Sequence, residues 1–204
     1  MKKRMLTVLL AVCLVAALGT VTAWAANDSG DFEVWSGGAL TGGNYKLAKD
    51  VTVSETIEIN GNVVLDLNGH TVTASGDPAF NIDNDGNLTI CDSSSDGDGK
   101  ITNTGSASFS EVIKICGVFE ITGGTIENIS QFGSALYVYK DRGDSGKAII
   151  SGGTSSNSGK FGYATRADMD ASDELNDGKI RHGAKHGEAT YATSHAYDKL
   201  KGGE

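Results

Sequence analysis

Proline is almost absent from this chain of 204 residues, because Pro78 is the only one. We therefore expect no cell-wall sorting signal of the Leu-Pro-x-Thr-Gly type. Aromatic residues make up only 7% of the sequence, and the 17 basic residues are outnumbered by 26 acidic ones, which gives a formal net charge of −9. Phosphate backbones attract basic surfaces, so this balance argues against a nucleic-acid-binding protein.

Long apolar runs are also scarce, and the only one lies near the N-terminus. Three basic residues (2–4) precede the apolar run 5–21, which ends at Ala23-Trp24-Ala25. This order is typical of a secretory signal peptide, so we predict that residues 1–25 are removed. The mature chain then comprises residues 26–204 and has a formal charge of −9 − 3 = −12. We expect it to be extracellular, either free or associated with a cell surface, with no membrane span after cleavage, which excludes a cytoplasmic enzyme and a multi-span membrane protein.

The body of the chain is rich in glycine, with 28 residues, and its apolar residues alternate with polar ones. The alternating pairs are Val51/Val53, Ile57/Ile59, Leu65/Leu67, Phe80/Ile82, Leu88/Ile90, Ile113/Ile115, Phe119/Ile121 and Leu136/Val138. A period of two predicts strands with one buried face. Corner sequences such as Asn60-Gly61 and Gly123-Gly124 separate the strands. The region is therefore all-β.

The strands also repeat on a longer scale. The interval from Ile59 to Ile82 recurs unchanged from Leu67 to Ile90 and from Ile115 to Val138. Three short strands recur in the same order over four turns: 56–60, 63–67 and 70–73; 80–83, 88–91 and 100–103; 112–116, 119–122 and 125–128; 136–139, 148–151 and 154–157. Such a repeat favours a three-sided parallel β-helix, whereas an antiparallel sandwich does not require a repeating three-strand unit.

The predicted fold is a short right-handed three-sided parallel β-helix of about four turns with an N-terminal cap. After the signal peptide (1–25), we place the cap at 26–50 and the β-helix at 51–159. Phe32 and Trp35 are expected to close the first turn. Residues 160–204 are predicted to form a polar tail, disordered or irregular, because Leu, Ile and Val occur there only three times after residue 160.

Two strings carry a resemblance to a known family. Leu65-Asp-Leu-Asn-Gly-His-Thr71 and Gly123-Gly-Thr-Ile126, the latter echoed at Gly152-Gly-Thr154, are similar to sequences of right-handed parallel β-helix proteins of the pectate-lyase-like superfamily. More narrowly, residues 40–157 resemble secreted or surface repeat proteins of Gram-positive and gut bacteria. The resemblance implies the fold but not one reaction, since members include polysaccharide lyases, glycosidases and adhesins. It also implies longer relatives.

An acidic loop offers one candidate metal site. Asp92, Asp96 and Asp98 lie in a short segment that also contains three serines, and calcium takes several oxygen ligands from flexible loops. The same cluster also fits a solvated acidic loop, which is the interpretation we favour. Calcium is thus the only cofactor that the sequence suggests.

Catalytic chemistry finds little support in the sequence. A polysaccharide lyase needs a base facing acidic calcium ligands, but the few basic residues of 26–159 are scattered and are outnumbered by acidic ones. A glycosidase needs two carboxylates placed on either side of the glycosidic bond. Glu58, Asp66 and Glu120 fall at outward strand positions, but a solenoid also carries its solubilising charges at such positions. Cys91 and Cys116 fall on different sides of the predicted helix, which disfavours a disulfide unless the register slides.

These observations predict a secreted, non-enzymatic β-helix module that binds glycans or other cell-surface ligands along its flat sheets and corner loops. The sequence leaves two alternatives open: a carbohydrate-active enzyme or its remnant, acting on acidic polysaccharide with calcium, and an N-terminal fragment of a longer surface protein. It does not predict an oligomeric state.

Overall fold

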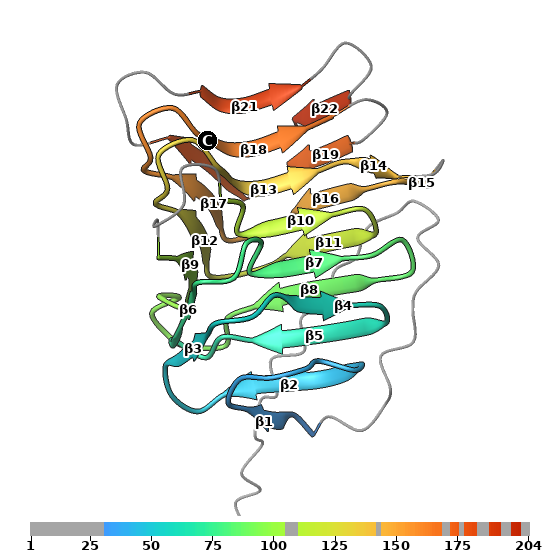
Figure 1. The fold of residues 1–204 in the computed structure, drawn as a ribbon. Coiled ribbons are helices and arrows are strands. Elements are labelled where there is room, and N and C mark those ends of the chain that lie inside the picture. The colour runs from blue at the N-terminus through green and yellow to red at the C-terminus, as the bar shows by residue number, and fades with distance from the viewer. Residues whose placement is uncertain are drawn as a thin grey trace, which may run out of the picture. The chain divides into compact units, whose positions relative to one another are not determined.

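The computed structural model describes residues 31–104, 110–141, 144–168, 172–175, 178–182, 188–192 and 197–200. The predicted signal peptide lies outside these residues. Within them every regular element is a β-strand, and no helix long and apolar enough to cross a membrane is found. Figure 1 shows the strands arranged as successive turns from β1 to β22.

Three parallel sheets contain almost all of the strands. Sheet A has eight, in spatial order β1 (Glu33–Trp35), β2 (Gly43–Leu47), β5 (Asn62–Asp66), β8 (Asn87–Cys91), β11 (Val118–Ile121), β16 (Lys147–Ile150), β19 (Ser172–Leu175) and β22 (Tyr197–Leu200). Sheet B has six: β3 (Val51–Val53), β6 (Thr71–Ala74), β9 (Lys100–Asn103), β12 (Thr125–Asn128), β17 (Thr154–Asn157) and β20 (Lys179–His182). Sheet C has six: β4 (Ile57–Ile59), β7 (Phe80–Ile82), β10 (Ile113–Ile115), β13 (Ser134–Val138), β18 (Tyr163–Ala167) and β21 (Glu188–Ala192). The short strands β14 (Lys140–Asp141) and β15 (Asp144–Ser145) form an antiparallel pair.

Each turn visits the three sheets in the same order. After β4 in sheet C the chain enters sheet A at β5 and sheet B at β6, and it then returns to sheet C at β7, which pairs in parallel with β4. The result is a β-solenoid of about five turns. The predicted all-β parallel architecture is confirmed, and each predicted three-strand unit lies on the three sheets as expected.

The turn-to-turn register matches two of the three equal intervals noted in the sequence. Ile59 pairs with Ile82, and Ile115 pairs with Val138. The third interval, from Leu67 to Ile90, does not correspond to a pairing, because Ile90 pairs with Leu65. The corner between β7 and β8 is longer than the corner between β4 and β5, so the offset from one turn to the next is larger here in sheet A than in sheet C.

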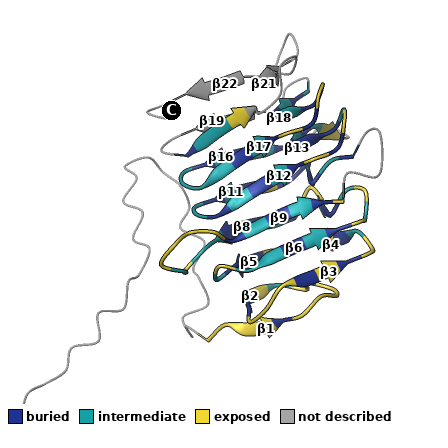
Figure 2. Cartoon of the chain, turned by 90° about the vertical axis from the view of Figure 1, so that its left-hand side faces the viewer, coloured by how far each residue is buried: buried dark blue, intermediate teal, exposed yellow. Residues whose placement is uncertain are grey.

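The core lies between the three sheets. Side chains alternate between buried and partly exposed along the strands, as Figure 2 shows for β6, β9 and β12. The largest fully buried side chains are Phe80, Phe119, Leu47, Ile59, Leu65, Leu67, Ile82, Leu88, Ile90, Ile101, Ile113 and Ile115. Trp35 is 4% exposed, as expected for a residue that closes the first turn, whereas Phe32 is 40% exposed and does not.

A column of buried asparagines lines the inner side of sheet B where its strands end. Asn103, Asn128 and Asn157 stack on successive turns and are at most 2% exposed. Asn103 donates through Nδ2 to Asn128 Oδ1 at 3.0 Å, and Asn128 donates to the Ser110 carbonyl at 2.6 Å. Buried amides need such partners, so this column fixes the corner that follows each strand. The sequence analysis placed these residues at the ends of predicted strands but did not predict the column, because the search for buried faces followed apolar residues.

The predicted irregular tail requires a correction. β18, β19 and β20 continue all three sheets after residue 160, and β21 and β22 add two further strands. Large apolar side chains are not required at every inward position, since Ala164, Thr165 and Ala167 are buried. The Thr165 hydroxyl lies 3.4 Å from that of Ser155, which itself donates to the Ala164 carbonyl at 2.8 Å. Small residues and paired hydroxyls therefore fill the inner side of β18.

Candidate functional site

The outward side chains of sheet C form a continuous row across successive turns. The strand register places one residue per turn in it: Glu58, Asn81, Lys114, Tyr137 and Arg166. Each lies between two buried residues of its strand, so alternation directs it away from the core. Adjacent parallel strands lie about 4.8 Å apart, so this outer row of sheet C presents chemically different groups at a regular spacing.

Two tyrosine rings and two cations lie together where the outer row crosses β10, β13 and β18. Tyr137 and Tyr139 extend from the same side of the chain at β13, and their rings stack with centroids 5.7 Å apart. The Lys114 Nζ lies 4.6 Å from the centroid of the Tyr139 ring, and the Arg166 guanidinium carbon lies 4.6 Å from that of Tyr137. Cation–π attraction thus holds the two cations against the aromatic pair from the turns on either side.

Asp168 connects the aromatic pair to the next turn. The Tyr137 hydroxyl donates to Asp168 Oδ2, and Arg166 Nη2 lies 3.4 Å from Asp168 Oδ1. Burial and then this hydrogen bond to a carboxylate raise the pKa of Tyr137 to about 12. The hydroxyl is therefore a fixed hydrogen-bond donor at any physiological pH.

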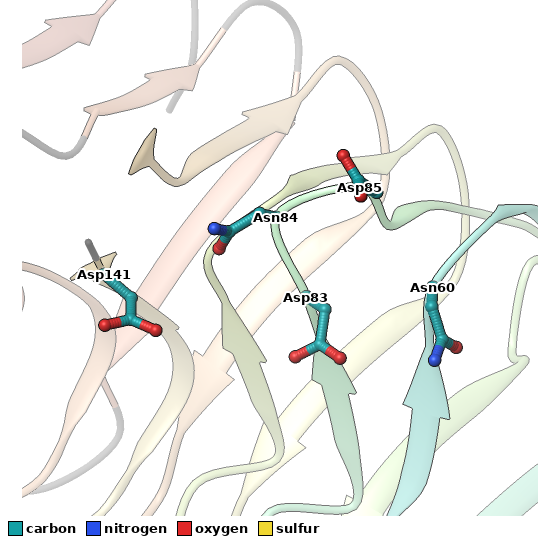
Figure 3. A pocket seen from close by; sticks show the side chains of 5 residues that line it. All are labelled: Asn60, Asp83, Asn84, Asp85 and Asp141. Atoms are coloured by element: carbon teal, nitrogen blue, oxygen red, sulfur yellow. The ribbon is translucent and has the colours of Figure 1, made fainter. Parts of the chain in front are cut away.

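An acidic hollow borders the row where sheet C turns into sheet A. It has a volume of about 370 Å³, is open to solvent, and is lined by Asn60, Asp83, Asn84, Asp85 and Asp141. Figure 3 shows the side chains of Asn60, Asp83 and Asp141 extending in the same direction, whereas Asp85 points away from them. Asn84 and Asp85, which lengthen the corner after β7, supply part of the wall.

The surroundings of the row are predominantly acidic. Burial, and then nearby acidic groups that include Asp141 and Asp83, raise the pKa of Tyr139. On the other side of the row, burial and the neighbouring Asp77 raise the pKa of Glu111. Lys114 and Arg166 are thus cations on a face that is bordered by carboxylates.

The predicted calcium ligands lie in the loop between β8 and β9. Asp92 Oδ1 accepts the backbone N–H groups of Gly69 and Ser94, at 2.8 and 3.1 Å, and Oδ2 accepts that of Gly99 at 2.6 Å. Burial alone would raise the pKa of Asp92, but the hydrogen bonds from Ser94, Gly99 and Gly69 lower it below its ordinary value. The Asp92 carboxylate therefore fixes the conformation of the loop between β8 and β9.

The structure does not bring the three aspartates together as a site. Asp96 and Asp98 are exposed, and Asp96 accepts a hydrogen bond from the Ser95 hydroxyl at 3.0 Å. Among the described residues no group of three acidic, histidine or cysteine side chains is placed to hold a metal. The calcium assignment stays a prediction.

The three carboxylates considered for glycoside hydrolysis are not grouped either. Glu58 lies on sheet C, whereas Asp66 and Glu120 lie on sheet A. Asp66 is only 2% exposed; its Oδ1 accepts the N–H groups of Asn68 and Ser93, both at 2.9 Å, so it holds a corner. Glu120 accepts a hydrogen bond from the Ser151 hydroxyl.

The two cysteines of the body also lie on different sheets. Cys91 ends β8 in sheet A, and Cys116 follows β10 in sheet C; both remain thiols. This placement agrees with the predicted turn alignment, which puts the two cysteines on different sides of the solenoid without any shift in register.

The fold and this face define the chain as a parallel β-solenoid protein with an aromatic and charged outer row on one sheet. No protein-family profile, curated protein or solved structure matches the chain. Sequence reasoning missed Tyr137, Tyr139, Lys114 and Arg166 as a group. The available signal was the register itself, since the next-to-last residue of each strand from β4 to β18 in sheet C falls in one column once the turns are aligned.

Proposed function

We propose that the protein is a secreted, non-enzymatic β-helix module of the pectate-lyase-like type that binds neutral glycans, as part of a cell surface or extracellular matrix, on the outer row of sheet C. The stacked pair of Tyr137 and Tyr139 between Lys114 and Arg166 is the observation that carries the proposal. The members of this cluster come from β10, from β13 and the residue after it, and from β18, so the ligand would lie across several turns.

The chemistry of the row suits a sugar polymer. Sugar hydroxyl groups bond with polar and charged side chains, and the apolar faces of sugar rings pack against aromatic ones. Because Lys114 and Arg166 cover the outer faces of the Tyr137–Tyr139 pair, a sugar would contact the edges of the two rings. On earlier turns of the row, Asn81 Nδ2 donates to Glu58 Oε2 at 2.6 Å, so the exposed Glu58 carboxylate is a further polar group along the same face. A flat sheet with regularly spaced groups can contact several units of an extended chain.

Charge supports a neutral ligand over a polyuronate. Asp83, Asp85 and Asp141 border one side of the row, and Glu111 and Asp77 border the other. Two cations, already stacked on tyrosine rings, offer little compensation for a polyanion. This favours a binding module over the alternative of an enzyme that acts on acidic polysaccharide with calcium.

A glycan array tests the proposal with two matched variants. The double variant Tyr137→Ala/Tyr139→Ala removes the ring pair, and Thr73→Ala/Thr102→Ala alters the outer side of sheet B at the same number of positions. We expect neutral oligosaccharides to bind the unmodified protein and the sheet B variant equally, and the tyrosine variant at least about tenfold more weakly. Circular dichroism confirms that each variant is folded.

Two results would contradict the proposal. Equal glycan binding by all three proteins would show that the binding site does not involve the tyrosine pair on sheet C. Release of unsaturated uronate from polygalacturonate, dependent on calcium, would favour the enzyme instead.

A further inference from the structure

The chain contains two Asn-Gly sequences, Asn60-Gly61 and Asn68-Gly69, which can undergo the same spontaneous reaction. The backbone nitrogen of the glycine attacks Cγ of the asparagine and expels ammonia, which leaves a cyclic succinimide. Water then opens the ring to aspartate or isoaspartate. Glycine permits the reaction because no Cβ hinders the backbone rotation that brings the two atoms together. The structure places these two sequences in opposite environments.

Asn68 is held away from this reaction at both reacting groups. Its side-chain Nδ2, the group that would leave as ammonia, donates to the Leu47 carbonyl at 3.0 Å. The Gly69 nitrogen, which would attack, donates its hydrogen to Asp92 Oδ1 at 2.8 Å. Asn68 also lies in the left-handed region with φ of 48°, where its own N–H donates to Asp66 Oδ1 at 2.9 Å. Reaction at Asn68 requires this corner to open.

Asn60 has none of these restraints. Its side chain is exposed, and within the described residues neither its carboxamide nor the Gly61 N–H has a hydrogen-bond partner. A Cβ added at Gly61 would have no atom within 4 Å, so the backbone there has room to rotate. Asn60 also follows β4, which lies at the edge of sheet C. The Gly61 carbonyl accepts the Asn87 N–H at 3.0 Å, which anchors the far side of the corner.

The corresponding Asp-Gly sequences of the body are also restrained at the glycine nitrogen. Gly86 donates to the Asp83 carbonyl at 2.8 Å, Gly97 donates to the Ser94 hydroxyl at 3.1 Å, and Gly99 donates to the Asp92 carboxylate at 2.6 Å. Asn60-Gly61 is therefore the Asn-Gly or Asp-Gly sequence in the described residues whose attacking nitrogen is not held by a hydrogen bond.

We propose that Asn60 is a site of self-deamidation in the folded protein, converted to aspartate and isoaspartate by Gly61 and water while Asn68 is preserved. The product carries a new carboxylate at the rim of the acidic hollow, next to Asp83 in the register, because Ile59 pairs with Ile82. Conversion thus adds negative charge beside the outer row of sheet C, and isoaspartate also lengthens the backbone by one methylene between β4 and β5.

Peptide mapping by mass spectrometry tests the proposal on the full chain. The protein is incubated in mildly alkaline buffer, once folded and once in concentrated urea, and conversion at Asn60 and Asn68 is followed with time. In the folded protein Asn60 should convert at least about tenfold faster than Asn68, and in urea the two rates should become similar because glycine follows both. Gly61→Ala, for which the corner has space, should slow conversion of Asn60 by about tenfold or more.

Three results would overturn the proposal. The first is conversion of Asn68 as fast as that of Asn60 in the folded protein. The second is a suppression of Asn60 by folding, relative to urea, that is as strong as that of Asn68. The third is conversion at the unmodified rate in the Gly61→Ala variant, once circular dichroism has shown that the variant is folded.

Discussion

The guanidinium of Arg166 stacks on the ring of Tyr137 from the next turn of the solenoid, with its Cζ 4.6 Å from the ring centroid. Both side chains also contact Asp168, Tyr137 through its hydroxyl and Arg166 through Nη2. The outer row of sheet C is therefore a connected network between β13 and β18. A change at Tyr137 should affect both the stability of these turns and the proposed binding face.

Replacing Tyr137 with Phe should remove a pH-dependent part of the stability. The folded-state pKa of about 12 lies above the ordinary tyrosine value of 10.0. The contribution is therefore fully present below pH 10 and is lost as the pH rises towards 12. We expect Tyr137→Phe to cost about 1 kcal/mol or less at neutral pH, since the group is partly exposed. Urea unfolding of both proteins at several pH values measures this, and a constant difference up to pH 12 would contradict it.

The buried asparagine column should be costly to interrupt. Asn128 donates to the Ser110 carbonyl and accepts hydrogen bonds from Asn103 and from the Ser130 N–H. Asn128→Ala removes all three hydrogen bonds; it leaves the buried Ser130 N–H without its acceptor, and leaves Asn103 Nδ2 and the Ser110 carbonyl only longer bonds of 3.2–3.5 Å. We therefore expect a loss of about 1–3 kcal/mol in the free energy of unfolding. The exposed Asn62 is the control, and Asn62→Ala should change stability by about 0.5 kcal/mol or less. Similar losses for both variants in urea unfolding would show that the column is not structural.

Glu111→Gln should stabilise the protein at neutral pH. Burial and the nearby Asp77 raise the folded-state pKa of Glu111, so its ionisation opposes folding. By linkage, its favourable contribution is present below the ordinary carboxyl pKa and is lost as the pH rises through the folded value. At neutral pH, the variant should therefore unfold at a higher urea concentration than the unmodified protein. In acid, the two proteins should unfold at the same urea concentration. The exposed Glu33→Gln serves as control; a gain of equal size there would point to net charge instead.

Asp92→Asn should weaken the β8–β9 loop whether or not calcium is present. The carboxylate accepts three backbone N–H groups, and an amide cannot accept at both of its atoms. We expect a loss of about 1–3 kcal/mol. Because the folded-state pKa is lowered, the contribution is present above the ordinary carboxyl pKa and is lost as the pH falls below it. Thermal melts with calcium and with chelator test this; a calcium-dependent rise in Tm that Asp92→Asn abolishes would establish a calcium site instead.

The strands and their order could be predicted from the sequence because period-two alternation and glycine corners are local signals. The exact register could not be predicted where it depends on corner length, as in the pairing of Leu65 with Ile90. Prediction failed after residue 160, where the core side is filled by residues such as Ala167. The signal there was the equal interval from Ile150 to Leu175 and from Leu175 to Leu200, which the register reproduces. A search for large apolar residues overlooks that repeat.

The binding face could not be predicted residue by residue. Tyr137 and Arg166 lie far apart in the sequence, and neither belongs to a motif. They meet only because parallel pairing brings β13 and β18 together in this register. The same holds for Asp92 and Gly69, which the stacking of successive turns brings together, so that Asp92 Oδ1 accepts the Gly69 N–H at 2.8 Å.

An NMR titration of the isotope-labelled protein with a neutral oligosaccharide selected from the array tests the central claim most directly. We predict that the largest chemical-shift changes fall on β10, β13 and β18, around Lys114, Tyr137 and Arg166. Residues on the outer side of β6 and β9 should show no change in chemical shift. Changes centred on sheet B or on the β8–β9 loop, with sheet C unaffected, would contradict it.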